Sequence, residues 1–148
     1  MAKEIIATTN APGAVGPYVQ AVKVNGMVYC SGQLGIDPAV GKLPEGVEAQ
    51  AHRSMKNLGA VLEEAGSDFS KVVKTTIFLA DMDDFAKVNE IYKSYFGETY
   101  PERSCVQVAK LPLGGLVKAV SVILDNRKRL LACLELLIDF SATGGRDV

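Results

Sequence analysis

Two amphipathic stretches constrain what this chain can fold into more than any other feature. In the first, from about residue 47 to residue 65, apolar residues recur every three to four positions, and Gly66 follows where a left-handed cap is expected. The second begins near Asp83, where aspartates complement the positive end of a helix, and ends at Gly97. Its apolar face consists of Phe85, Val88, Ile91, Tyr92, Tyr95 and Phe96. Each helix needs an apolar surface to cover, and a β-sheet is the expected partner.

Strand patterns surround these two helices. Asn25-Gly26 separates two short alternating runs, and this dipeptide favours a tight turn with positive φ at both positions, so a β-hairpin is predicted. Further strands are predicted at about 71–79, 104–109 and 117–124. This order indicates an α+β fold in which both helices pack on one face of a mixed sheet. The other sheet face is apolar enough that self-association is the natural way to cover it.

Length and charge limit the possible functions. A chain of 148 residues, 48% hydrophobic and 22% charged, suits one globular domain with a substantial core. Its net charge of −1 provides no basic surface for a phosphate backbone, and the cluster Arg127-Lys128-Arg129 is more typical of a solvated turn. The N-terminus lacks the apolar core of a signal peptide, and no apolar run reaches membrane-spanning length.

Cysteine and histidine usage bears on the compartment and on metals. Cys30, Cys105 and Cys133 are an odd number without paired spacing, so we expect no disulfide framework and a reducing, cytoplasmic location. His52 is the one histidine, and its place in a helical pattern indicates a helix-surface residue. With one histidine and no close cysteine pair, no metal site is predicted.

A single arginine stands where a turn changes into an apolar strand. Pro101 fixes its own φ and biases Tyr100 toward extended conformations, so the chain turns before Arg103. From Ser104 onward, small, polar and branched residues predict a strand that Pro112 ends. An arginine held by rigid backbone presents a planar set of donors that suits a carboxylate. A solvated surface arginine in an ion pair is the alternative.

Seven short motifs follow one another along the chain: Ala11-Pro12, Gly16-Pro17-Tyr18-Val19-Gln20-Ala21, Ser31-Gly32-Gln33, Val73-Lys74-Thr75-Thr76, Asp81-Met82-Asp83-Asp84-Phe85, Val88-Asn89-Glu90 and Arg103-Ser104-Cys105-Val106. Together they resemble the reactive-intermediate deaminase (RidA/YjgF) family, also called L-PSP "endoribonuclease" proteins. The resemblance implies a chorismate-mutase-like α+β fold that forms homotrimers with a cleft at each subunit boundary. It also implies hydrolysis of 2-imino acids, such as 2-iminobutanoate and 2-iminopropanoate, to 2-oxo acids and ammonia, without a metal or organic cofactor.

The resemblance assigns residues to this site. Arg103 matches the family arginine that binds the substrate carboxylate, in agreement with the donor geometry expected at this strand, and we predict it as the catalytic position. Tyr18 would lie over the ligand, with a core aromatic as the alternative. Ser31 and Gly32 end the hairpin strand, where a small hydroxyl and a bare backbone allow a ligand to approach closely.

Asn89 and Cys105 complete the predicted substrate-binding set. Asn89 would reach the cleft from the second helix, although a solvated helix asparagine is the alternative. Cys105 lies two residues beyond Arg103, so both side chains point to the same side of a strand. Because no base is expected beside it, we interpret Cys105 as a residue that lines the cleft, with a small buried hydrophobe as the alternative, and not as a nucleophile.

The match to the family fails in the last strand. The family strand normally begins with an alternating Glu-Ile-Glu, and its first glutamate is thought to orient the attacking water. Aligned without a gap, Lys118 replaces that glutamate; with a two-residue gap the glutamate is still missing, and no carboxylate occurs before Asp125. An ammonium group cannot accept a proton from water, so we expect weakened rather than absent deaminase activity.

The end of the chain exceeds the usual family end. Its apolar residues fall at helical spacing and predict an extra amphipathic helix, with an added strand as the alternative. We therefore divide the chain into one RidA-like domain at residues 1–124 and a divergent C-terminal extension at residues 125–148, packed on the domain or trailing from it.

Three functions remain open from the sequence. The first is a hydrolytic deaminase of 2-imino acids, and the second is a non-catalytic regulatory protein that binds 2-oxo acids. The third is an L-PSP-type endoribonuclease that inhibits translation, which neither the charge balance nor the single histidine recommends. The expected partners are a small 2-imino or 2-oxo acid and further copies of this chain in a homotrimer, with no membrane and no cofactor.

Overall fold

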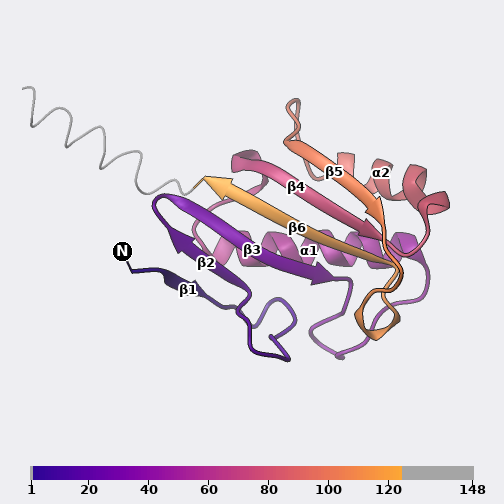
Figure 1. The fold of residues 1–148 in the computed structure, drawn as a ribbon, viewed down its shortest axis with the longest axis horizontal. Helices are drawn as coiled ribbons and strands as arrows, with labels where there is room; N and C mark the ends of the chain where they lie inside the picture. The colour runs from indigo at the N-terminus through magenta and orange to yellow at the C-terminus, as the bar shows by residue number, and fades with distance from the viewer. Residues whose placement is uncertain (1, 125–148) are drawn as a thin grey trace, which may run out of the picture.

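The computed structural model describes residues 2–124, which form one mixed sheet with two helices behind it (Figure 1). The sheet has six strands in the order β1-β2-β3-β6-β4-β5. All neighbouring strands are antiparallel except β4 and β5, which are parallel. The predicted α+β class is therefore confirmed, whereas the extension predicted at residues 125–148 lies outside the described residues.

The elements follow the predicted order with one addition at the start. They are β1 (Glu4–Ile6), β2 (Ala21–Val24), β3 (Met27–Leu34), α1 (Val47–Glu64), β4 (Val72–Leu79), α2 (Phe85–Lys93), β5 (Glu102–Gln107) and β6 (Val117–Leu124). The sequence pattern does not reveal β1, because three residues are too few for an alternation to stand out. Short 3₁₀ turns precede β4, α2 and β6.

The turn and the helix end that were predicted from residues favouring positive φ are confirmed. Asn25 and Gly26 have φ values of 55° and 74°, as the hairpin requires, and Gly66 has a φ of 75° beyond α1. The prediction that the second helix reaches Gly97 is wrong, because α2 ends at Lys93. There the hydroxyl of Ser94 donates to the carbonyl of Ile91 at 2.6 Å, a local bond that competes with continued helix.

The core lies between the two helices and the sheet. Its fully buried members include Leu58 and Leu62 of α1 and Val28, Leu79 and Ile123 of the sheet. Burial of this apolar surface is the main stabilising contribution to such a fold. Among residues 2–124, no helix combines the length and the apolar character that crossing a membrane requires.

Two buried polar side chains of α1 hold the end of β3 in place. Ser54 donates to the carbonyl of Gln33 at 2.8 Å, and Asn57 donates to the carbonyls of Leu34 and Ile36 at 2.9 and 2.8 Å. The register between β3 and β6 shifts between Cys30 and Gln33, so the strand has an irregularity there. These bonds fix the backbone around the two residues inside that irregularity, Ser31 and Gly32.

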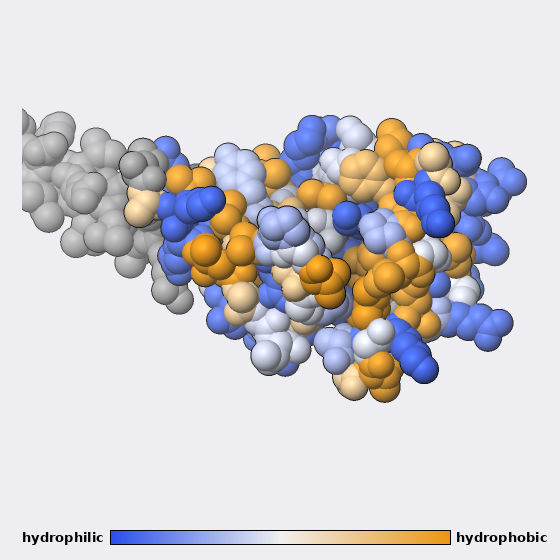
Figure 2. Space-filling view, turned by 60° about the horizontal axis from the view of Figure 1, so that its bottom comes forward, coloured by the Kyte–Doolittle hydropathy of each residue, from blue (hydrophilic) through white to orange (hydrophobic). Residues whose placement is uncertain are grey.

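The sheet face away from the helices is not covered by any element of residues 2–124 (Figure 1). Apolar side chains of neighbouring strands share it, because cross-strand partners point to the same face. They include Tyr29, Phe78, Val106, Val120, Val122 and Leu124. Figure 2 shows hydrophobic side chains interrupting the polar surface in an oblique view. This bare sheet face fits the expectation that the fold needs a partner to cover it.

Candidate binding site at Arg103

Arg103 is the second residue of β5 and points toward the helix side of the sheet. It pairs with Thr75 of β4, and its guanidinium donates from Nη1 to Oδ1 of Asn89 in α2 at 2.8 Å. Within residues 2–124 this is the one hydrogen bond of the guanidinium, which has no ion pair with any described carboxylate. Most of its five N–H donors are therefore available to a ligand.

Two aromatic rings of α2 flank the same guanidinium. Its central carbon lies 4.8 Å from the ring centroid of Tyr92 and 5.5 Å from that of Phe85. Phe85, Asn89 and Tyr92 are four and then three residues apart, so they share one face of the helix. The periodicity of the second helix places both rings on its apolar face and assigns them no role at the site. Their spacing from Asn89 is the sequence signal that links them to it.

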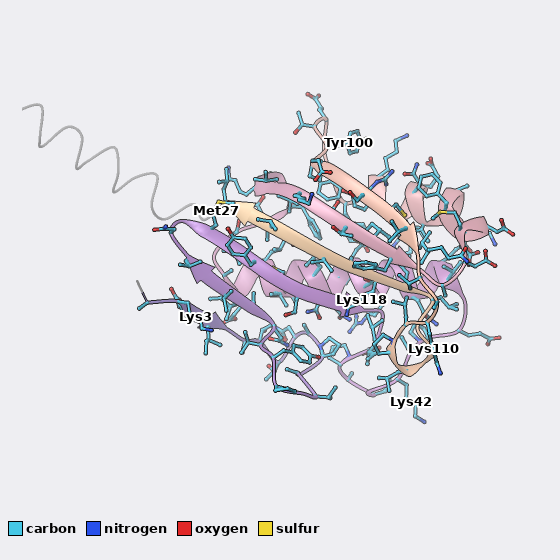
Figure 3. The ribbon with its side chains drawn as sticks, viewed as in Figure 1. Lys3, Met27, Lys42, Tyr100, Lys110 and Lys118 are labelled. Atoms are coloured by element: carbon cyan, nitrogen blue, oxygen red, sulfur yellow. The ribbon has the colours of Figure 1, made fainter. Side chains whose placement is uncertain are left out.

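A pocket of about 420 Å³ opens beside Arg103. Its lining consists of Asn89, Tyr92, Lys93, Tyr100, Pro101 and Arg103. Two cationic side chains and two tyrosines therefore surround a space between α2 and the start of β5, where Figure 3 labels Tyr100. Such a mixture of apolar walls and a few polar groups is typical of a small-molecule site, and its charge favours an anion.

Cys105 lies on the same side of β5 as Arg103, as the strand alternation predicts. Burial raises the pKa of its thiol, and the positive charge of Arg103 opposes that effect only in part. The thiol is therefore protonated at neutral pH, which makes it a poor nucleophile. The one histidine does not serve it as a base, because His52 contacts the hydroxyl of Tyr95 at 3.1 Å.

The tyrosine ring beneath Arg103 is itself fixed in the core. Tyr92 is 4% exposed, and its hydroxyl shares a buried hydrogen bond of 2.7 Å with Thr75. Burial raises the pKa of this phenol, while the bond to Thr75 and the charge of Arg103 lower it. Tyr92 is therefore neutral at physiological pH and acts on Arg103 through its ring.

The other predicted residues form a second group around the end of β3. Ser31 donates from its hydroxyl to the carbonyl of Val19 at 2.6 Å, and its backbone N–H donates to the carbonyl of Gln20 at 2.8 Å. Gln20 in turn donates to the carbonyls of Thr8 and Pro12 at 3.0 and 2.8 Å. These bonds hold the loop that carries Tyr18, whose side chain is 49% exposed and is therefore not a core aromatic.

Lys118 joins this second group from β6. It neighbours the buried Val117 and Ala119, so its side chain points to the bare sheet face, where Figure 3 labels it. A methyl group added to Gly32 would overlap with the Lys118 side chain, so the lysine lies directly against the glycine. Within residues 2–124, Lys118 has no ion pair with a carboxylate.

The two groups of predicted residues do not meet within one protomer. Strands β6 and β4 separate β3 from β5, which places the groups roughly 14 Å apart at ordinary strand spacing. They also use opposite faces of the sheet, since Arg103 faces α2 and Lys118 faces away from it. The structure therefore brings together Asn89 and Arg103, but not these with Tyr18, Ser31 and Gly32. Cys105 lies on the same face of β5 as Arg103, but it is not among the residues that line the pocket. No cluster of residues that could hold a metal ion occurs in the part of the chain described.

An α+β sheet that carries a half-buried arginine in a partly apolar pocket is an arrangement suited to a small anionic ligand. The chain belongs to the family described as endoribonuclease L-PSP, whose model matches residues 8–122, and the predicted RidA/YjgF membership is confirmed. It is 52% identical over 121 residues to the Mus musculus protein named 2-iminobutanoate/2-iminopropanoate deaminase, covering 81% of this chain and 90% of that one.

Solved structures of related proteins share the fold. The crystal structure of Escherichia coli TdcF with bound serine is 43% identical, with a TM-score of 0.80, and the match covers 83% of this chain and 99% of that one. The structure of RidA from the Antarctic bacterium Psychrobacter is 47% identical, also with a TM-score of 0.80, over 82% of this chain and 98% of that one.

Proposed function

We propose that this protein hydrolyses 2-imino acids, such as 2-iminobutanoate and 2-iminopropanoate, to 2-oxo acids and ammonia. The observation that carries the proposal is the guanidinium of Arg103, held by Asn89 and Tyr92 with most of its donors open toward the pocket. A 2-imino acid offers a carboxylate that such a fork binds through two parallel hydrogen bonds. The names of the similar mouse protein and of TdcF with bound serine support the same ligand class.

The chemistry requires water rather than a protein nucleophile. With the substrate carboxylate held by Arg103, the carbon of the protonated imine is fixed in the pocket. The thiol of Cys105 stays protonated and does not attack it. Water adds to that carbon, and one proton moves from the added oxygen to the nitrogen. The carbon–nitrogen bond then breaks while the second proton passes from that oxygen to the departing ammonia, which gives the 2-oxo acid and ammonium. These reaction steps balance without an oxidant or a cofactor.

We further propose that the site is complete only in a homotrimer, with the Arg103 group of one subunit facing the Tyr18, Ser31 and Gly32 group of the next. The bare sheet face supports this, because closed assembly would bury it. Light scattering should give three times the 15.8 kDa mass of one chain. A monomeric mass at micromolar concentration would contradict the proposal.

We propose that Lys118 weakens the reaction. The lysine lies on Gly32 where the family glutamate is expected to orient water, and an ammonium group cannot take up the proton. Lys118→Glu should raise kcat by about a hundredfold or more, the lower end of the range for general acid–base catalysis. Lys118→Gln is the matched control, because it removes the charge without supplying a base. An equal gain in both variants would assign the effect to charge alone.

The direct test measures ammonia and 2-oxo acid released from a freshly generated 2-imino acid. The wild-type protein should exceed the uncatalysed rate, and Arg103→Ala should return it to background. A wild-type rate equal to background, together with binding of a 2-oxo acid, would favour the second candidate, a regulatory 2-oxo-acid-binding protein. The observation that favours this candidate is Lys118 in place of a general base.

RNA cleavage is the activity that the family description names. A net charge of −1 gives this chain no broad basic surface, and no pair of histidines is present for proton transfer. We therefore expect no salt-dependent binding when single-stranded RNA is titrated. The protonated thiols of Cys30 and Cys105 suit the reducing cytoplasm in which we propose the protein acts.

A further inference from the structure

We propose that Tyr92 is a positioning residue that holds the Arg103 guanidinium in the plane needed to bind a carboxylate. This inference rests on the proposed function, because it concerns the same arginine. It goes beyond that function by assigning the geometry of the site to a side chain that does not itself need to donate to the ligand.

The first observation is how firmly Tyr92 is held. Its hydroxyl shares a 2.7 Å hydrogen bond with Thr75, and Thr75 is the residue of β4 that pairs directly with Arg103. Tyr92 is thus hydrogen-bonded to the cross-strand partner of Arg103. The ring of Tyr92 also packs against that of Phe96, with centroids 4.7 Å apart. The Tyr92 ring is therefore held both by the hydrogen bond of its hydroxyl and by its contact with Phe96.

The second observation is how few other groups restrain Arg103. Its one hydrogen bond within residues 2–124 goes to Asn89, which leaves rotation about that bond open. The Tyr92 ring at 4.8 Å and the Phe85 ring at 5.5 Å limit that rotation, because the guanidinium carbon lies over both. A planar guanidinium held by ring faces loses less freedom on binding a ligand than a free one.

Removal of the ring should therefore weaken carboxylate binding, whereas removal of the hydroxyl alone should matter less. We expect Tyr92→Leu to raise the inhibition constant of 2-oxobutanoate by about tenfold, as loss of a partly desolvated cation–π contact implies. Tyr92→Phe keeps the ring and should stay within about threefold of wild type. Thr75→Val keeps the ring but leaves the buried Tyr92 hydroxyl without a partner, which favours a displaced ring, so its inhibition constant should fall between the two.

The experiment measures the inhibition constant for 2-oxobutanoate, KM and kcat in these variants, with thermal unfolding as a check on folding. Tyr95→Leu is the matched control, because Tyr95 is also a packed tyrosine, close to Phe69 and bonded to the carbonyl of His52, but does not contact Arg103. It should lose stability and leave the inhibition constant unchanged. A larger effect on KM than on kcat in Tyr92→Leu, restored in Tyr92→Phe, supports the positioning role.

Two distinguishable results would contradict a positioning role for Tyr92. If wild type is active but Tyr92→Leu and Tyr95→Leu change the inhibition constant equally, Tyr92 serves only the stability of the fold. If wild type neither turns over a 2-imino acid nor binds 2-oxobutanoate, the proposed function fails and the inference fails with it. A Tyr92→Leu protein that does not fold leaves Thr75→Val and Tyr92→Phe to decide, since a positioning role requires Thr75→Val to bind more weakly than Tyr92→Phe.

Discussion

The Arg103 region and the Gly32 region are built in different ways. In the Arg103 region (Phe85, Asn89, Tyr92 and Arg103), side chains of one helix hold one strand residue through a hydrogen bond and two ring contacts. In the Gly32 region (Tyr18, Ser31, Gly32 and Lys118), backbone carbonyls and a strand irregularity hold a loop beside an uncovered sheet face.

This difference suggests a separate task for each region, ligand binding for the Arg103 region and completion of the site by a second copy for the Gly32 region. The Arg103 region is preorganised inside one protomer, so changes there should act on ligand affinity. The Gly32 region has an exposed tyrosine and lies by the bare sheet face, so changes there should act on chemistry and on contact with a neighbouring copy. The following variants test that division.

Arg103→Ala should have the largest effect on activity. Loss of a charge-assisted bidentate grip removes several kcal/mol of binding and orientation, so kcat/KM should fall by about a thousandfold or more. Arg53→Ala is the control, since Arg53 forms an ion pair with Asp37 at 3.1 Å outside the pocket and its loss should leave kcat/KM unchanged. If Arg103→Ala stayed within about tenfold of wild type, the arginine would not be the binding group.

Cys30 should make stability fall at high pH. Burial raises the pKa of this thiol from 9.0 to about 11, so folding favours the protonated form. Its contribution is therefore complete below pH 9.0 and is lost as the pH rises to about 11, a decrease of about 3 kcal/mol in the free energy of unfolding. Urea unfolding across this range measures the slope, and Cys30→Ala should reduce it. An unchanged slope in that variant would assign the loss to other groups.

Gly32→Ala should lower activity through Lys118. The added methyl group overlaps with the flexible lysine side chain, which can move at little cost to stability but then enters the Gly32 region. We expect about a tenfold decrease in kcat/KM, and partial recovery in the double variant with Lys118→Ala, because contacting residues are energetically coupled. An identical loss with and without Lys118 would show that the backbone, not the lysine, is what the methyl group disturbs.

Cys105→Ser should have the smallest effect. Because burial raises the pKa of the thiol, the side chain is protonated and does not attack the substrate. Steady-state kinetics should give a decrease in kcat/KM of less than about threefold, whereas a nucleophile would lose far more. A loss comparable to that of Arg103→Ala would restore cysteine as the reacting group.

Sequence patterns predicted the architecture well where local signals were strong. The Asn25-Gly26 turn and the periodicity of α1 each specify one conformation, and the structure confirms both, together with the strand predicted at 117–124. The end of α2 was missed because a side-chain bond from Ser94 ends the helix before the apolar periodicity does. Short β1 gave too few residues for a pattern.

The site was predicted in its residue types more than in its geometry. Strand alternation correctly put Arg103 and Cys105 on one side of β5, and Asn89 does reach the arginine. The support from Tyr92 was hidden, since an aromatic at a core-facing helix position has the same pattern whether or not a cation lies over it. The separation of the Gly32 region from Arg103 depends on strand order, which local patterns do not encode.

The most direct test of a site shared between two copies is subunit complementation. Arg103→Ala and Gly32→Val each disable a different region, so each protein alone should be inactive. After mixed refolding, a random heterotrimer should regain roughly a quarter of the wild-type sites, because an intact Arg103 of one subunit then faces an intact Gly32 of its neighbour. We predict that recovery of activity in the mixture. Activity no greater than the sum of the two separate variants would contradict a site built from both regions.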